Sequence, residues 1–202
     1  NARIYLGLNK ELTPGEFYEA CQNQTIENHL NVITPVKGDL IYIKPGTLHS
    51  AKGGIIVAEI QQVSDVTYRV YDWGREHNPK TAREMHLDLA IDCIDYNPLI
   101  PESLLYLDGS CETSYFNIKQ LNLNKKTKLL VNSQMERSFL IYIATQGEHI
   151  FQYKEIKEKL KEGEVILIPH SLGEFSIEGN GKLLEVTCNI NIEQSLSNEE
   201  YS

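Results

Sequence analysis

The chain has 202 residues, of which 41% are hydrophobic and 23% are charged, a balance typical of globular proteins rather than disordered ones. Its 28 acidic and 19 basic residues give a formal net charge of −9, which argues against nucleic acid and anionic membranes as partners. No apolar run is long enough to span a membrane, and the four cysteines, which include no Cys-x-x-Cys pair, predict reduced thiols in a cytoplasmic protein.

The N-terminal segment combines a strand with a capped helix. Apolar residues alternate along residues 3–8, which predicts a strand with one buried face. Because this strand begins at once and no Met precedes it, we expect that the chain was cut from something longer. Thr13, Pro14 and Glu16 supply an N-cap, a first-turn proline and a capping box. They predict a helical segment over about residues 14–29, regular to about residue 22.

Short β-rich runs bounded by glycine and proline make up most of the remaining chain. Several short strands with such turns predict a β-sandwich or barrel. A polar loop over residues 74–83 and a short helix over residues 86–95 interrupt the pattern. The expected strands lie near residues 32–36, 40–43, 55–60, 66–71, 113–121, 128–131, 139–145, 165–168 and 183–189.

The runs fall into two lobes. Two prolines bracket residues 97–101, which is the best linker candidate, so we expect domains at 1–97 and 98–202. Residues 37–45 and 162–169 share a Gly-acidic turn, an apolar run and a proline, which is a weak internal repeat of two β-lobes. In the second copy Gly173 falls near the position of His49, so the second lobe is expected to lack metal ligands.

Two residues of the first lobe could carry chemistry. His49 follows an apolar run and a Pro-Gly turn, and it is either an ordinary loop histidine or a metal ligand aimed from a rigid element. Glu59 is the one charge in an apolar run. It is either a strand-end residue that reaches solvent or a buried base with a raised pKa.

Arginines cluster further along the same lobe. Arg69 lies on one face of a predicted strand, where it could hold a developing oxyanion or form a structural pair with Asp65 or Asp72. Arg75, Lys80 and Arg83 make the following loop basic in an acidic protein. That loop would suit a phosphate, although such clusters are commonly only solvated.

The order of these motifs resembles one family. PGTLH at residues 45–49, AEIQQVSDVTYRVYDWGR at residues 58–75 and ARE-M-HLDLAID at residues 82–92 look like type I mannose-6-phosphate isomerase in its short bacterial form. The resemblance is strong over residues 3–95, looser beyond, and corresponds to the C-terminal portion of the family. It implies a mainly β, cupin-like jelly roll, with an incomplete first lobe that carries the helical insertion and a second, smaller β-sandwich lobe.

The resemblance also implies roles for single residues. The family is a zinc enzyme that interconverts mannose 6-phosphate and fructose 6-phosphate, and its last zinc ligand matches His49. Its other three ligands, a Gln and a His in a Q-x-H motif and a later Glu, are expected upstream of this chain. Arg69 matches a catalytic arginine and Glu59 an active-site glutamate, while Asp65 and Arg75 match substrate-binding positions.

The resemblance leaves more than one function open. The expected activity is zinc-dependent aldose–ketose isomerisation of a small sugar phosphate, although a chain with one zinc ligand is expected to catalyse little by itself. The alternative is a non-catalytic cupin that binds or senses a sugar phosphate, and a more distant one is another metal cupin such as an oxygenase. The ligand motifs in the upstream sequence would distinguish these functions.

Overall fold

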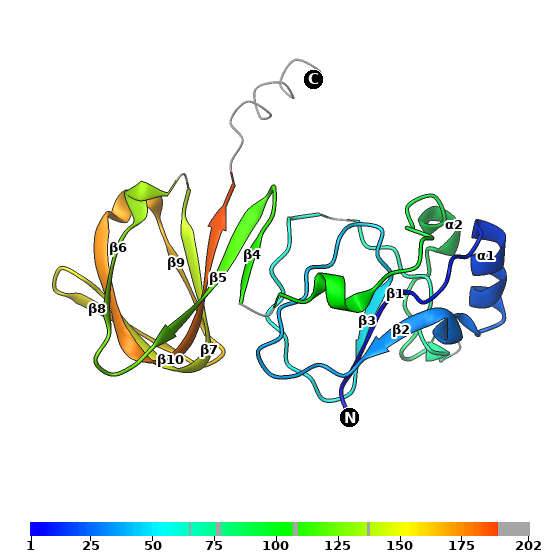
Figure 1. Ribbon diagram of the computed structural model, residues 1–202, viewed down its shortest axis with the longest axis horizontal. Helices are drawn as coiled ribbons and strands as arrows, with labels where there is room; N and C mark the ends of the chain where they lie inside the picture. Colours follow the sequence, from blue (N-terminus) through cyan, green and yellow to red (C-terminus); the bar gives the residue numbers. More distant parts are fainter. Residues whose placement is uncertain (65, 76–77, 107–108, 137, 190–202) are drawn as a thin grey trace, which may run out of the picture. The chain divides into compact units, whose positions relative to one another are not determined.

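A computed structural model describes residues 1–64, 66–75, 78–106, 109–136 and 138–189. The chain divides into two compact units, Asn1–Leu105 and Tyr106–Ser202, and each has a β-sheet of its own (Figure 1). Residues 98–105 belong to the first unit, where the Leu99 N–H donates to the Leu8 carbonyl at 2.8 Å. No helix in the described ranges is long and apolar enough to cross a membrane.

The first unit is built on a small antiparallel sheet. Strand β1 (Arg3–Leu8) lies between β2 (Leu30–Ile33) and β3 (His49–Lys52). The predicted first strand is therefore confirmed. Its expected single buried face is not, because Tyr5 and Leu6, which point to opposite faces, are both buried. A central strand is covered on both faces, which alternation in the sequence did not indicate.

Helix α1 (Pro14–Gln22) begins as the sequence predicts. The Thr13 side chain accepts from the Glu16 N–H at 3.3 Å, and the Glu16 carboxylate accepts from the Thr13 N–H at 2.7 Å. A short 3-10 helix, η1 (Ile26–His29), continues the segment. The core below these elements consists of Leu8, Leu12, Phe17, Ala20, Cys21 and Ile26.

Three expected strands of the first unit do not form. Residues 40–43 contribute only an isolated bridge from Ile41 to Leu105, and residues 55–60 and 66–71 carry no strand. The physical reason is the lack of a paired backbone: within the described residues these apolar runs have no neighbouring strand, and β propensity alone does not hold an extended segment. Ile56 and Val63 are accordingly 101% and 93% exposed.

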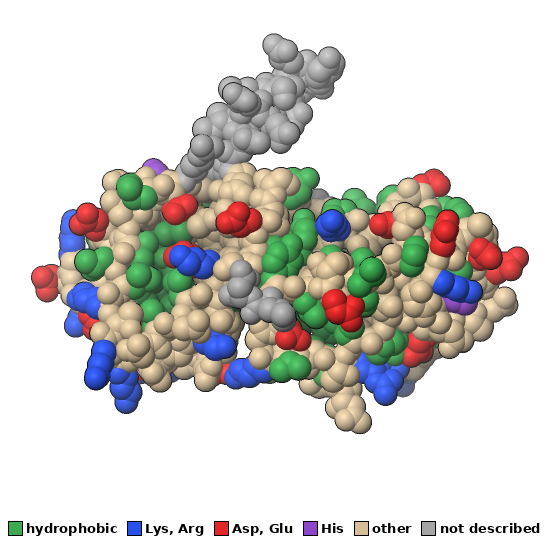
Figure 2. Space-filling view, viewed as in Figure 1, with side chains coloured by type: hydrophobic (Ala, Val, Ile, Leu, Met, Phe, Trp, Pro, Cys, Tyr) green, Lys and Arg blue, Asp and Glu red, His purple; other side chains and the backbone are tan. Residues whose placement is uncertain are grey.

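The remaining elements of the first unit are short. Helix α2 (Leu87–Ala90) occupies only the start of the helix expected over residues 86–95, and the 3-10 helix η3 (Pro101–Leu104) follows the proline-bracketed segment. Apolar side chains among the charged ones at the surface of both units are visible in Figure 2.

All four cysteines of the chain are free thiols, and burial raises the pKa of Cys21 to about 12.

The second unit is a β-sandwich with two small helical turns. Its strands are β4 (Ser110–Glu112), β5 (Phe116–Leu123), β6 (Lys128–Asn132), β7 (Leu140–Tyr153), β8 (Ile156–Lys161), β9 (Val165–Ile168) and β10 (Glu174–Cys188). The 3-10 helices are η4 (Ser133–Met135) and η5 (His170–Leu172). Every strand pairing among the described residues of this unit is antiparallel, so the predicted mainly β sandwich is confirmed for it.

The two long strands, β7 and β10, run through both layers of the sandwich. The second half of β10 pairs with β5 and with the first half of β7, whereas its first half pairs with β6 and with the second half of β7. The change of layer occurs where Gly147 and Gly181 lie opposite each other. A Cβ at Gly181 (φ +136°) would lie 2.0 Å from the Gln146 carbonyl oxygen, so only glycine fits the bend.

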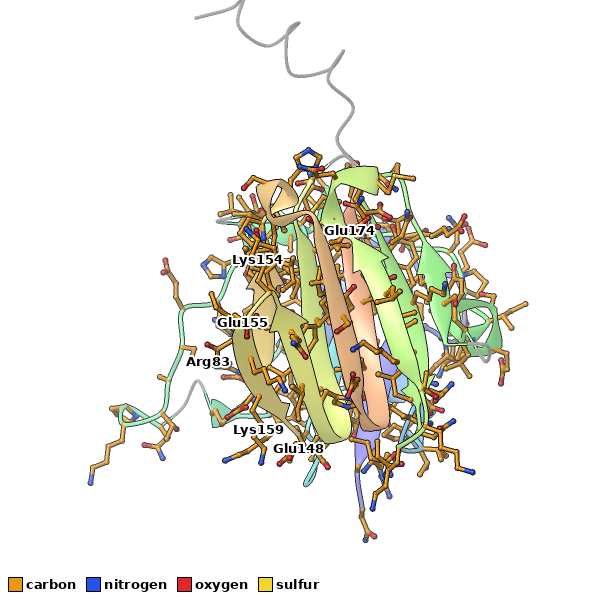
Figure 3. The ribbon with its side chains drawn as sticks, turned by 90° about the vertical axis from the view of Figure 1, so that its left-hand side faces the viewer. Arg83, Glu148, Lys154, Glu155, Lys159 and Glu174 are labelled. Carbon is orange, nitrogen blue, oxygen red and sulfur yellow. The ribbon has the colours of Figure 1, made fainter. Side chains whose placement is uncertain are left out.

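Both layers contribute to one core. Leu140, Tyr142 and Leu183 from one layer and Phe151 and Ile177 from the other are all buried. The outward face of the β7–β8 pair is polar by contrast: Glu148 and Lys159, labelled in Figure 3, form an ion pair at 2.7 Å. This alternation of buried apolar and exposed charged side chains is expected for a sheet that packs one face on the core and exposes the other to solvent.

Candidate active site

His49 is the first residue of β3 and lies opposite Leu6 of β1. A turn closed by the Thr47 N–H and the Lys44 carbonyl at 3.1 Å leads into the strand. Gly46 in that turn has φ +83°, and a Cβ there would lie 2.7 Å from a backbone oxygen. The Pro-Gly sequence therefore fixes where the histidine emerges.

The ring of His49 is oriented by its own loop. Its Nδ1 lies 2.9 Å from the Thr47 carbonyl oxygen, and the side chain is exposed. Because a carbonyl only accepts, Nδ1 carries the proton in the neutral ring, and Nε2 keeps its lone pair. Metal-binding histidines commonly use this second contact to set their tautomer. His49 thus has the chemistry of one metal ligand.

Arg69 is held against residues 84–86. The Arg69 backbone N–H donates to His86 Nδ1 at 3.2 Å, and the His86 backbone N–H donates to the Arg69 carbonyl at 2.8 Å. The Arg69 side chain donates through Nη1 to the Glu84 carbonyl at 3.1 Å. His86 therefore helps to place Arg69. Two structural partners were expected for Arg69. Asp72 instead pairs with Arg75 and Arg83, and Asp65 lies outside the described residues.

Glu59 lies in the extended segment that follows β3, and its side chain is exposed. The plainer expectation, a glutamate that reaches solvent, describes its position in this structure. Proton abstraction from carbon needs a site that excludes water, so Glu59 would carry a proton only in a more enclosed site.

Asp72 is a site residue that sequence reasoning assigned only as a possible partner of Arg69. Its side chain is 0% exposed, and it binds two arginines. Arg75 Nη2 donates to Oδ1 at 2.5 Å, and Arg83 donates to Oδ2 through Nε at 3.0 Å and to Oδ1 through Nη2. The Arg83 guanidinium holds the pKa of the Asp72 carboxyl below its usual value against the effect of burial, and Arg75 adds to the lowering.

An aromatic cluster supports the segment around Asp72. The Trp73 ring lies 5.3 Å from Tyr5 and 5.1 Å from Tyr71, centroid to centroid, and its Nε1–H donates to Glu27 at 3.2 Å. Tyr5 donates to the same carboxylate, and this bond together with burial raises the Tyr5 pKa. Trp73 has φ +52°, a conformation that its packing must hold in place.

The described residues do not assemble a complete metal site. Among them no group of three or more His, Cys, Asp and Glu side chains lies close enough to hold a metal ion. Within the same residues no hydrogen bond or ion pair joins His49, Glu59 and Arg69 to one another. These residues alone therefore do not fit a zinc centre, and His49 fits only as one ligand of a larger set.

Comparison with known proteins first defines the class. Residues 110–188, which lie in the second unit, match the family model for the mannose-6-phosphate isomerase cupin domain. The chain in turn resembles the C-terminal portion of mannose-6-phosphate isomerases. The chain is 34% identical over 151 residues to the mannose-6-phosphate isomerase ManA of Bacillus subtilis, a match that covers 70% of this chain and 46% of that protein. The chain therefore spans about half the length of the curated relatives it matches.

Solved structures agree with the assignment. The mannose 6-phosphate isomerase of Bacillus subtilis matches with a TM-score of 0.76 at 28% identity, over 92% of this chain and 60% of that one. An isomerase of Salmonella typhimurium, solved with its substrate and a zinc atom bound, matches with a TM-score of 0.61 at 16% identity, over 88% of this chain and 45% of that one. The second likeness concerns the fold alone.

Proposed function

We propose that this chain functions in a zinc-dependent mannose-6-phosphate isomerase, which interconverts mannose 6-phosphate and fructose 6-phosphate. The observation that carries the proposal is the 34% identity to ManA over 151 residues, a stretch that must include parts of both units. The chain contributes His49 as one zinc ligand, Arg69 and Glu59 as catalytic residues, and Asp65 and Arg75 as substrate-binding residues.

The reaction explains these residue types. In the open-chain sugar, a base takes the proton from C2, a cis-enediol forms, and the proton returns to C1 while the hydroxyl proton moves from O2 to O1. Glu59 is the proposed proton carrier, and the Arg69 guanidinium stabilises the enediolate oxygens. Zinc, when bound, would polarise the carbonyl. Among the described residues no group of three or more His, Cys, Asp and Glu side chains is placed to hold the ion.

The exposure of Glu59 gives the proposal a direct consequence. Proton transfer from carbon needs a base and an oxyanion partner in a site that excludes water. Glu59 is exposed here. We therefore expect the 202-residue chain by itself to show isomerase turnover at background level, and the complete gene product to be active.

The test is a coupled assay that follows fructose 6-phosphate formation from mannose 6-phosphate. In the complete gene product, Arg69→Ala should lower kcat about 10²–10³-fold, the usual effect of removing one oxyanion donor. Lys125→Ala, an exposed cation in the second unit, is the matched control. Equal turnover in both variants would remove Arg69 from the mechanism.

Zinc content tests the ligand. His49→Ala should lower bound zinc in the complete gene product, whereas His170→Ala, which removes an exposed histidine of the second unit, should leave it unchanged. A complete gene product that binds mannose 6-phosphate without converting it would instead favour the alternative, a sugar-phosphate-binding cupin module.

A further inference from the structure

Arg75 and Arg83 are brought together by one carboxylate. Their Nη2 atoms both contact Oδ1 of Asp72, so the two guanidinium groups lie next to each other although they are separated along the chain. Asp72 is 0% exposed, while the side chains of Arg75 and Arg83 are 53% and 45% exposed. The carboxylate is therefore on the inside of this arrangement, and the two cations are on the outside.

The arrangement carries more positive charge than its own structure requires. One carboxylate neutralises one of the two guanidinium charges, so the group as a whole has a surplus of one positive charge. Arg83 meets Asp72 with Nε and Nη2, and this bidentate contact leaves its Nη1 hydrogens directed elsewhere. Two adjacent half-exposed guanidinium groups can share an anion that has several oxygens.

The site is held in position from two sides. The Arg75 N–H donates to the Asp72 carbonyl at 3.0 Å, which makes a tight turn between the two residues. Trp73 within that turn is fixed by its hydrogen bond to Glu27. Arg83, labelled in Figure 3, is eleven residues beyond Asp72 in the chain and donates to it through Nε at 3.0 Å. Preorganised donors lose less entropy when an anion binds.

We propose that Arg75 and Arg83 form a binding site for a phosphomonoester dianion, and that Asp72 is the positioning residue that holds the two guanidinium groups side by side. This site would take the phosphate group of a phosphorylated small molecule or free inorganic phosphate. The identification of the natural ligand as the phosphate of mannose 6-phosphate rests on the proposed function. The binding of phosphate at this site does not depend on that function.

The alternative is that Asp72 only closes the loop. A single arginine would neutralise the buried carboxylate, whereas two half-exposed arginines leave the group with a net positive charge at the surface. Lys80 provides the comparison within the same loop: it is exposed, and among the described residues its one hydrogen bond is from its backbone N–H to Asn78 Oδ1 at 3.0 Å. If net charge alone attracts phosphate, Lys80 should matter as much as the arginines.

The experiment measures phosphate binding by calorimetry and by 31P NMR on the complete gene product. The probes are inorganic phosphate, mannose 6-phosphate and mannose. Arg75→Gln and Arg83→Gln should each weaken phosphate binding about tenfold or more, and Lys80→Gln less than about twofold. Mannose 6-phosphate should displace phosphate, and mannose should not. Equal effects of all three substitutions, or none from the arginines, would overturn the proposal.

Asp72→Asn separates positioning from charge. It removes a negative charge near the anion, so simple electrostatics predicts tighter phosphate binding, whereas loss of positioning predicts weaker binding. We expect weaker binding in a folded variant, checked by circular dichroism; tighter binding would remove the positioning role. If Asp72→Asn does not fold, the two exposed arginine variants still decide the site.

The two proposals fail separately. Phosphate binding that depends on Arg75 and Arg83 in a protein without isomerase turnover would retain the anion site and reject the proposed enzyme. If the protein turns over substrate, and its affinities for phosphate and mannose 6-phosphate are unchanged by substitution of either arginine, the enzyme is retained and the anion site is rejected.

Discussion

Leu183 lies at the centre of the second unit and offers the sharpest test of where its stability resides. The side chain is 0% exposed, on β10, opposite Ala144 of β7 and Leu121 of β5. Leu183→Ala removes buried methyl groups and leaves a cavity, which costs about 2–5 kcal/mol. For a unit of this size, about 3 kcal/mol corresponds to a fall in Tm of roughly 12–24 °C.

Leu130→Ala is the matched control. It makes the same chemical change on β6 of the same unit, but the Leu130 side chain is 77% exposed. Its effect on the free energy of unfolding should stay within about 0.5 kcal/mol. The comparison therefore isolates burial, because residue type and unit are the same in both variants.

The assay can follow the two units separately. The only tryptophan of the chain, Trp73, lies in the first unit, so its fluorescence follows that unit, while circular dichroism reports the strands that make up most of the second. In guanidinium titrations Leu183→Ala should lower the midpoint seen by circular dichroism. Equal midpoints for Leu183→Ala and Leu130→Ala would refute the assignment of the core.

Three further predictions concern a cap, a bend and a buried charge. Thr13→Ala should cost about 1 kcal/mol of stability in the first unit, measured by Trp73 fluorescence, because it removes one side of the capping box. Gly181→Ala should cost more than about 1 kcal/mol, measured by circular dichroism, because its Cβ would meet a carbonyl oxygen at 2.0 Å, whereas Gly15→Ala, with nothing within 4 Å, should not destabilise. The lowered pKa of Asp72 means that its contribution to stability is present above the ordinary aspartate pKa near 4 and is lost as pH falls through the lowered folded-state value. The stability difference between the protein and Asp72→Asn should therefore shrink from about pH 5 to pH 2, and a difference that stays constant over that range would contradict the ion-pair assignment.

Local signals were read correctly from the sequence. The Thr13 and Glu16 side chains cap α1 as predicted, because a capping box depends only on residues three apart. The Pro-Gly turn before His49 forms for a similar reason: Gly46 is needed where φ is positive. The motifs around His49 and Arg69 also indicated the family that the comparisons support.

Strand pairing was not readable in the same way. Residues 55–60 and 66–71 have strong β propensity and form no strand, while β3 begins at His49, where no strand was expected. A strand exists only where another backbone accepts its hydrogen bonds, and that partner lies far away in sequence. Propensity therefore predicted the apolar runs without deciding which of them pair.

The sequence by itself determined the helix cap, the glycine turns, the mainly β composition and the resemblance carried by contiguous motifs, because each depends on residues that are neighbours along the chain. Only the tertiary structure decided that Asp72 is buried and that it joins Arg75 to Arg83, and that His86 places Arg69. The Asp72–Arg83 and Arg69–His86 contacts join residues from different segments. Their free energy comes from desolvation and hydrogen-bond geometry that exist only after the segments have packed together.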